Sequence, residues 1–145
     1  MIKKDESPIV LIVSRALSPF IMLFGWYVIA HGHYSPGGGF QGGAMLAASI
    51  LLIRLAAGTS MAELQFKKVW ATPAGVIGVF IFFGAGLAAV LLGGEFLNYE
   101  YLVFPGFTGA ELRSFSILIV EVGIGLAVMG FLVSIYDDLI EGRGE

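Results

Sequence analysis

Apolar residues form long, nearly uninterrupted runs along this chain. A bilayer core about 30 Å thick takes roughly 20 apolar residues in a helix that rises about 1.5 Å per residue. Four runs come close to or exceed that length, and they predict transmembrane helices over residues 9–30, 40–57, 73–92 and 115–136. The first run is too long for the apolar core of a secretory signal, so we interpret it as a span. The pattern therefore predicts an all-α integral membrane protein with four transmembrane helices.

Helix-start signals lie between these runs. Ser60 and Glu63 have capping-box spacing, which predicts a short interfacial helix reaching Lys68 between the second and third spans. Thr72 followed by Pro73 is typical of an N-cap with proline at the first helical position. The capping-box spacing recurs at Thr108 and Glu111, ahead of the fourth span. Residues 94–113 are then expected to form a long loop, with aromatic side chains at headgroup level.

Composition narrows the class of protein further. Of the 145 residues, 57% are hydrophobic and 13% are charged, whereas soluble domains carry about 25% charged residues. The net charge of -3 argues against a nucleic-acid-binding protein, which would need a positively charged surface. Cysteine is absent, which excludes disulfides and thiolate metal sites. Residues 1–145 are therefore expected to form a single membrane domain.

The distribution of Lys and Arg predicts the orientation in the membrane. Basic residues outside the spans are Lys3, Lys4, Lys67, Lys68 and Arg143 on the side of the two termini, against Arg113 on the other side. Cytoplasmic loops carry the excess of Lys and Arg. Both termini are therefore expected in the cytoplasm of a cell-membrane protein, with the turn after the first span and the long loop facing outward.

The most unusual stretch is the glycine-rich turn between the first two spans. Gly37, Gly39 and Gly42 match the pattern G-x-G-x-x-G, but a dinucleotide site needs a strand ahead of it, and here a long apolar helix precedes. We interpret the stretch as a sharp structural turn in which glycine supplies unusual backbone angles and close packing. The turn residues are Pro36, Gly37, Gly38, Gly39, Gly42 and Gly43.

Two charges inside the spans are candidates for an ion path. Glu121 lies about 10 Å, at about 1.5 Å per residue, from the outer end of the fourth span, and an intramembrane carboxylate is a functional-site hypothesis by default. The alternative is a buried structural hydrogen bond. Arg15 lies at a similar depth from the opposite face, where it either joins the path or extends to the cytoplasmic headgroups. A direct pair between them is not expected, since they enter from opposite faces.

Other polar residues have plainer interpretations. His31 and His33 are candidates for a proton relay, for a metal site or simply for interfacial polar residues, and the lack of a nearby carboxylate or thiol argues against metal. Arg54, close to the end of the second span, is expected to extend to the headgroups. Asp137, Asp138 and Glu141 are expected to form a solvated terminus of the fourth span.

Small residues spaced four apart suggest close helix packing. The pairs are Gly43 with Ala47, Ala44 with Ala48, and Gly84 with Ala88. Four spans with so few polar interior residues cannot easily enclose a complete ion path. The chain is therefore expected to be one component of a larger membrane assembly.

Specific motifs resemble a known family. Pro19-Phe20, the run from Gly25 to His33 and above all Ser35-Pro-Gly-Gly-Gly-Phe-Gln-Gly-Gly43 are similar to the B subunits of Mrp-type multisubunit cation/proton antiporters. The resemblance is strongest over residues 15–58. It implies a hetero-oligomeric complex that exchanges Na⁺ for H⁺, with this chain packed beside larger membrane subunits and carrying no active site or cofactor of its own.

The resemblance leaves the kind of complex open. The same module is built into complex-I-like respiratory assemblies, including archaeal membrane-bound hydrogenases and sulfur reductases. The Phe-Gln-Gly-Gly motif and the scarcity of Asn and Gln favour that setting over a stand-alone antiporter. A purely structural scaffold, with no residue in the ion path, is the remaining alternative.

Overall fold

The computed structural model describes residues 7–34, 37–102 and 104–142 and contains four long helices in that part of the chain. They are α1 (Pro8–Ala30), α2 (Gly38–Ala57), α4 (Ala71–Leu91) and α5 (Gly109–Glu141). A short helix, α3 (Thr59–Gln65), follows α2, and 3₁₀ turns cover Gly32–Tyr34, Lys68–Trp70 and Tyr99–Tyr101. No strand occurs in the described residues. All four long helices are apolar and long enough to cross a membrane, so the predicted fold class is confirmed.

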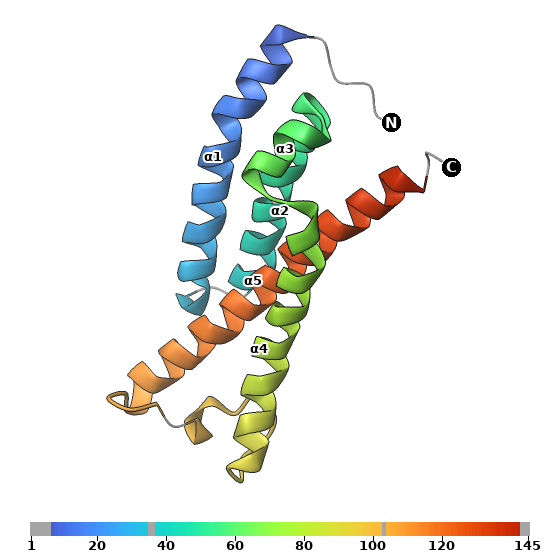
Figure 1. Ribbon diagram of the computed structural model, residues 1–145. Helices are drawn as coiled ribbons and strands as arrows, with labels where there is room; N and C mark the ends of the chain where they lie inside the picture. Colours follow the sequence, from blue (N-terminus) through green and yellow to red (C-terminus); the bar gives the residue numbers. More distant parts are fainter. Residues whose placement is uncertain (1–6, 35–36, 103, 143–145) are drawn as a thin grey trace.

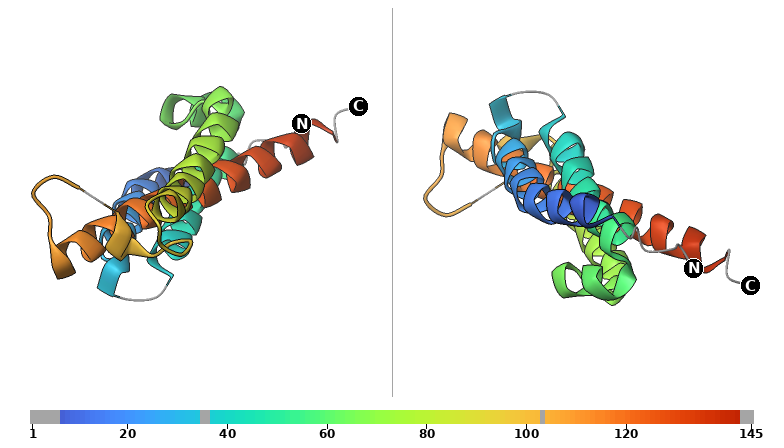
Figure 2. Two further views of the ribbon diagram at one scale, coloured as in Figure 1. Left: turned by 90° about the horizontal axis from the view of Figure 1, so that it is seen from below. Right: turned by 90° about the horizontal axis from the view of Figure 1, so that it is seen from above.

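The helices pass up and down in alternation, with α2 and α5 at the centre (Figure 1). The closely packed pairs are α1 with α2, α2 with α5, and α4 with α5. No comparable contact joins α1 and α4, which flank the central helices (Figures 1 and 2). The start of α1 and the end of α5 lie at one end of the bundle, near α3. The turn between α1 and α2 lies at the other end, as does the loop between α4 and α5.

The fourth long helix, α5, is longer than its hydropathy suggested. The expected span covered residues 115–136, whereas the helix has 33 residues and a length of about 50 Å at 1.5 Å per residue. It crosses the other helices obliquely (Figure 1). Since the bilayer core is about 30 Å thick, this tilt accommodates the extra length.

Two of the expected helix starts are wrong. Helix α3 begins at Thr59 after Gly58, has no side-chain cap and ends at Gln65, so Ser60 does not cap it. Helix α4 begins at Ala71 after Trp70, and the Thr72 hydroxyl lies 2.9 Å from the Ser134 hydroxyl of α5. Contact with another helix therefore replaces the expected cap. Thr108 does precede α5, but without a side-chain cap hydrogen bond.

Glycines bring the helix backbones into contact. A Cβ on Gly43 of α2 would lie 2.5 Å from the carbonyl oxygen of Gly125 in α5. A Cβ on Gly78 of α4 would meet the backbone of Gly123 in the same helix, α5. Gly84 has nothing within 4 Å of such an atom, so the expected packing at that position does not occur among the described residues. Close helix approach is what small residues provide in a membrane, where lipid and side chains are equally apolar.

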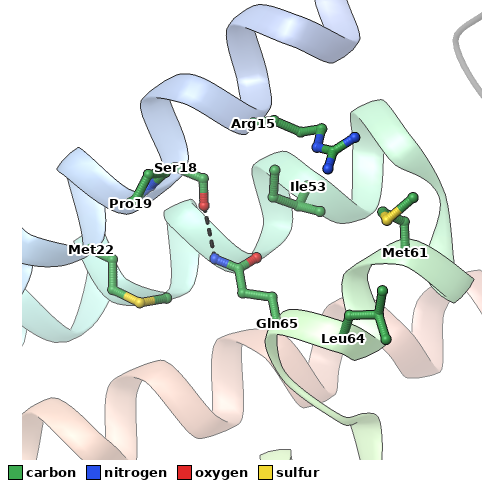
Figure 3. A pocket seen from close by; sticks show the side chains of 8 residues that line it. All are labelled: Arg15, Ser18, Pro19, Met22, Ile53, Met61, Leu64 and Gln65. Atoms are coloured by element: carbon green, nitrogen blue, oxygen red, sulfur yellow. Dashed lines mark hydrogen bonds between the residues drawn. The ribbon is translucent and has the colours of Figure 1, made fainter.

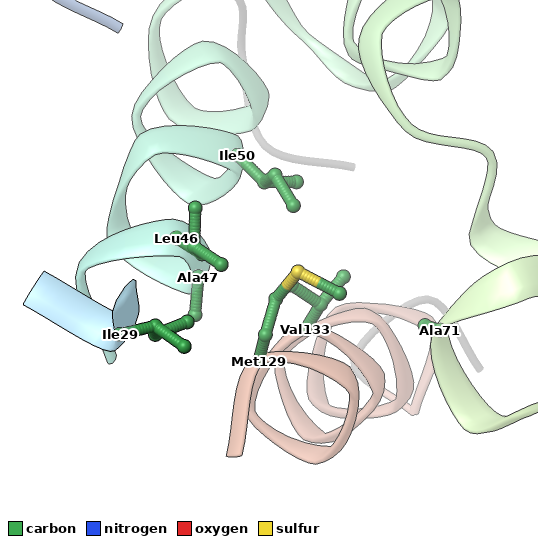
Figure 4. Packing of buried hydrophobic residues seen from close by; sticks show 7 residues of the cluster. All are labelled: Ile29, Leu46, Ala47, Ile50, Ala71, Met129 and Val133. Atoms are coloured by element: carbon green, nitrogen blue, oxygen red, sulfur yellow. The ribbon is translucent and has the colours of Figure 1, made fainter. Parts of the chain in front are cut away.

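A compact apolar core lies between the central helices and the ends of α1 and α4 (Figure 4). Its buried members are Ile29, Leu46, Ala47, Ile50, Ala71, Met129 and Val133. The core joins the glycine contacts at one end to a set of polar contacts at the other. It therefore fixes α2 against α5, and these two helices carry most of the polar residues considered below.

Candidate functional site

The carboxylate of Glu121 lies against the glycine-rich turn. Its Oε2 accepts a hydrogen bond from the backbone N–H of Gly39, in the first turn of α2. The first N–H groups of a helix have no partner within it and carry a partial positive charge, so a carboxylate is stabilised there. Glu121 is half-buried at this position, and no cation of the described residues pairs with it.

Glycines of the turn leave space for this carboxylate. A Cβ on Gly32 would lie 3.0 Å from Oε2 of Glu121, and one on Gly39 would lie 2.5 Å from the same oxygen. Gly37 adopts a left-handed conformation, with φ of 89°, just before α2 begins. The glycines of the turn therefore make room for an acidic side chain of a distant helix. Pro36, the remaining predicted turn residue, lies outside the described residues.

Further along α2, Gly42 and Gly43 pack against two other helices. A Cβ on Gly42 would lie 2.6 Å from the carbonyl oxygen of Gly25 in α1, and Gly43 faces Gly125 of α5. Helix α2 begins at Gly38, so these two glycines lie in its second turn, where neighbouring backbones approach them closely. The motif thus joins α1, α2 and α5 at the end of the bundle where Glu121 lies.

Tyr99 is a neighbour of this site that the sequence did not indicate. It lies in the 3₁₀ turn Tyr99–Tyr101 of the loop between α4 and α5, and its side chain is half-buried. Burial and the negative charge of Glu121 both raise the pKa of the Tyr99 hydroxyl above its ordinary value. Nothing in the sequence indicates this proximity, because it depends on how the Tyr99–Tyr101 turn packs against α5.

Of the two histidines, His31 has a described side chain, and it contacts its own helix. Nδ1 of His31 lies 3.0 Å from the carbonyl oxygen of Tyr27, and its exposed ring packs against the ring of Tyr27 at 4.1 Å. The side chain of His33 lies outside the described part of the structure. Within residues 7–34, 37–102 and 104–142, no group of three His, Asp or Glu side chains could hold a metal ion.

A buried ion pair lies near the opposite end of the bundle. Nη1 of Arg54 in α2 donates to Oδ1 of Asp137 in α5, and the two side chains are only 1% and 5% exposed. Nη2 of Arg54 also donates to the carbonyl oxygen of Phe66, at 3.2 Å. The expectations that Arg54 extends to the headgroups and that Asp137 is solvated are therefore wrong. Each charge makes burial of the other possible, and hydropathy along the chain cannot show such a pairing.

Arg15 of α1 lies apart from both of these groups, on the side of α1 that faces α3. Its side chain is exposed and points into a pocket of about 410 Å³ between α1, α2 and α3 (Figure 3). Beside it, the Ser18 hydroxyl donates to the carbonyl oxygen of Ser49 and accepts from the Gln65 amide, at 2.9 and 2.8 Å. Arg15 therefore lies at the level of α3, and the bundle separates it from Glu121.

The fold and these polar sites define an integral membrane protein whose charged residues form separate groups at its two ends. The chain belongs to a family described as a domain related to the MnhB subunit of the Na⁺/H⁺ antiporter, which matches residues 9–134.

Named relatives agree with this assignment. The putative antiporter subunit mnhB2 of Staphylococcus haemolyticus is 32% identical over 145 aligned residues, covering 95% of this chain and 98% of the relative. The B subunit of the Na⁺/H⁺ antiporter of Bacillus subtilis is 28% identical and covers 96% of both chains. The protein of the same name from Alkalihalophilus pseudofirmus is 31% identical and covers 85% of both. The resemblance to the antiporter B subunits is thereby confirmed.

Proposed function

We propose that this chain is the B subunit of a stand-alone multisubunit antiporter that exchanges Na⁺ for H⁺ across the cell membrane. The observation that carries the proposal is similarity along nearly the whole chain to proteins named as antiporter subunits. Their names favour the stand-alone complex over the hydrogenase or sulfur reductase setting expected from Phe-Gln-Gly-Gly. The partners in this proposal are the other membrane subunits, and the chain itself carries no active site.

The separation of the charged groups supports a shared ion path. Glu121 lies beside the α1–α2 turn, whereas the Arg54–Asp137 pair lies toward the start of α1 and the end of α5. An apolar core lies between them, and its members include Leu46, Ile50 and Met129. A proton or Na⁺ would therefore have no continuous row of polar groups to follow within the described chain. In our proposal the path runs along a boundary with a neighbouring protein of the complex.

Glu121 is the residue that we assign to this path. A carboxylate in a span costs about 2.5–3.5 kcal/mol on insertion scales at the helix centre, and less nearer the ends. The hydrogen bond from the Gly39 N–H compensates part of that cost. The side chain is only half-buried, so a cation or water can also reach it. Arg15, His31 and His33 were the other candidates. Arg15 faces the other end of the bundle, and the His31 ring packs on Tyr27.

Substitution of Glu121 tests this assignment. Glu121→Gln keeps the size and most hydrogen bonds but cannot titrate, and Glu121→Ala also removes the hydrogen bond to Gly39. We expect both variants to assemble, with Na⁺-dependent proton exchange in everted vesicles reduced strongly in each. The exposed Glu111 on the same helix provides the matched control, Glu111→Gln, which should leave exchange unchanged. Normal exchange by an assembled Glu121→Gln variant would make the residue structural.

Co-purification in mild detergent tests the kind of complex. A tag on this chain should recover other antiporter subunits and no redox subunits. Recovery of a hydrogenase or sulfur reductase would contradict the stand-alone assignment and would support the respiratory alternative. Recovery of this chain alone, folded and monodisperse, would contradict both.

The proposal places both termini in the cytoplasm because five of the six basic residues outside the spans lie on that side. The native chain lacks cysteine, so single cysteines can report topology. Cysteine at Ser60 should resist an impermeant reagent in intact cells, whereas cysteine at Ala110 should react. Labelling of position 60 from outside would contradict this orientation.

A further inference from the structure

An apolar groove opens between α1 and α4, which are not in close contact with each other, and residues of α2 and α5 form its floor. It holds a pocket of about 420 Å³. Trp26 of α1 and Ile77 of α4 line its two sides, and Leu46 of α2 and Leu126 of α5 are among the other lining residues. The groove faces the region that lipid or another protein of the complex fills in a membrane.

The groove has a charged end. Met22 and Gln65 line both this pocket and the pocket that contains Arg15, so the two adjoin. Arg15 points into the second pocket together with Ser18 and Gln65 (Figure 3). Within the described residues, no carboxylate pairs with the Arg15 guanidinium. The combined cavity is therefore amphipathic, with a cation at one end and apolar side chains along the other.

The charged end lies at headgroup level. Arg15 is opposite Leu64 of α3, a short helix outside the spans, and the exposed Trp70 lies at the start of α4 on the same side. Tryptophan prefers the membrane–water boundary. Basic pockets between helices on the cytoplasmic side are typical sites for anionic lipid headgroups.

The apolar pocket has the size of a small-ligand site. Its volume of about 420 Å³ lies within the range of about 300–1,000 Å³ that is usual for such ligands. Its lining is almost entirely apolar, which suits a hydrocarbon chain, while a negatively charged group suits the adjoining pocket that contains Arg15.

We propose that this groove binds one anionic phospholipid, with its phosphate on the Arg15 guanidinium and an acyl chain between α1 and α4. The guanidinium offers paired N–H donors that match phosphate oxygens, and the Gln65 amide, which donates to Ser18, lines the same pocket. The side chains of Trp26, Ile77 and Leu126 contact the acyl chain. This site is separate from Glu121 and does not depend on the proposed exchange activity.

Photo-crosslinking tests the proposal in the complex purified through a tag on this chain. The probes are phosphatidylglycerol and phosphatidylcholine with the same photoreactive acyl chain, in matched nanodiscs. We expect phosphatidylglycerol to label peptides of α1 and α4 more strongly than phosphatidylcholine. Arg15→Gln should reduce that labelling about fivefold, since one basic residue contributes about 1 kcal/mol of attraction to an anionic membrane. Arg113→Gln, at the other end of the molecule, should leave it unchanged.

A second variant covers the case in which Arg15→Gln fails to assemble. Leu64 is 83% exposed and lines the pocket beside Arg15, so Leu64→Glu would place a carboxylate next to the guanidinium without disturbing the core. It should lower phosphatidylglycerol labelling, while Leu64→Gln should not. Equal labelling by the two lipids would overturn the proposal. So would labelling insensitive to both Arg15→Gln and Leu64→Glu, or cross-linking of position 15 to another protein of the complex in place of lipid.

Discussion

The buried pair of Arg54 and Asp137 provides a quantitative test of the packing between α2 and α5. Asp137→Leu removes the carboxylate and leaves a guanidinium whose side chain is only 1% exposed. Arg54→Met leaves the Asp137 carboxylate buried and also removes the donor to the Phe66 carbonyl oxygen. The double variant replaces both charges with apolar side chains that fill the same region.

The magnitudes follow from the burial of the two charges. Removing one member of a buried ion pair costs about 3–5 kcal/mol, because the remaining charge is uncompensated. Replacing both members with apolar residues is often neutral, or stabilising by about 1–4 kcal/mol. We therefore expect each single variant to be severely destabilised and the double variant to regain most of the loss. For a chain of this size a loss of about 3–5 kcal/mol lowers the melting temperature by roughly 10–20 °C.

The chain offers a matched control in a second ion pair. Nη1 of Arg113 lies 2.9 Å from Oε1 of Glu100, and these side chains are 52% and 63% exposed. An exposed pair contributes about 0.2–1 kcal/mol. Arg113→Met and Glu100→Leu, alone or together, should therefore change the melting temperature only slightly.

The assay is thermal dissociation of the detergent-solubilised complex, followed by gel filtration with a fluorescent tag on this chain. The two single variants and the double variant form a double-mutant cycle. If the two single effects add to within about 0.5 kcal/mol, the side chains are not coupled and the assignment of a buried pair is wrong. A double variant less stable than either single variant would refute the reasoning equally.

Further predictions concern the glycine contacts and Tyr99. Gly78→Ala should destabilise the bundle by about 1–3 kcal/mol through overpacking, because its Cβ would meet the backbone of Gly123 and Ala127, whereas Gly84→Ala should be tolerated in thermal dissociation. Gly39→Ala should reduce ion exchange by displacing the Glu121 carboxylate, and it should also lower thermal stability, because its Cβ would lie 2.5 Å from the Glu121 backbone carbonyl oxygen as well. Proton exchange in vesicles is therefore compared at equal amounts of assembled complex. The pKa of the Tyr99 hydroxyl should be lower in Glu121→Gln than in the native chain, because a negative charge that raises it is gone. The measurement is an ultraviolet pH titration in which the spectrum of the same protein with Tyr99→Phe is subtracted, so that only Tyr99 contributes.

Much of the architecture could be predicted from the sequence because the bilayer imposes a simple rule. Every backbone polar group in the apolar core must be satisfied within its own helix, so a span needs a long apolar run. The hydropathy pattern therefore located all four spans to within a few residues, except that α5 extends beyond both expected ends. The glycine-rich motif and the family were likewise evident, since both depend on residues that are close together along the chain.

Side-chain partnerships were decided by the tertiary structure. The Arg54–Asp137 pair joins residues 83 positions apart, and the hydrogen bond from Gly39 to Glu121 joins residues 82 apart. In a soluble helix, an apolar stripe would reveal the buried face, but membrane helices are apolar on nearly every face and their periodicity carries little such information. The cap expected at Thr72 is wrong for a related reason, since a local motif cannot show that the Ser134 hydroxyl of a distant helix supplies the partner. Which residues meet depends on the crossing and register of α2, α4 and α5, and those are set by packing in three dimensions.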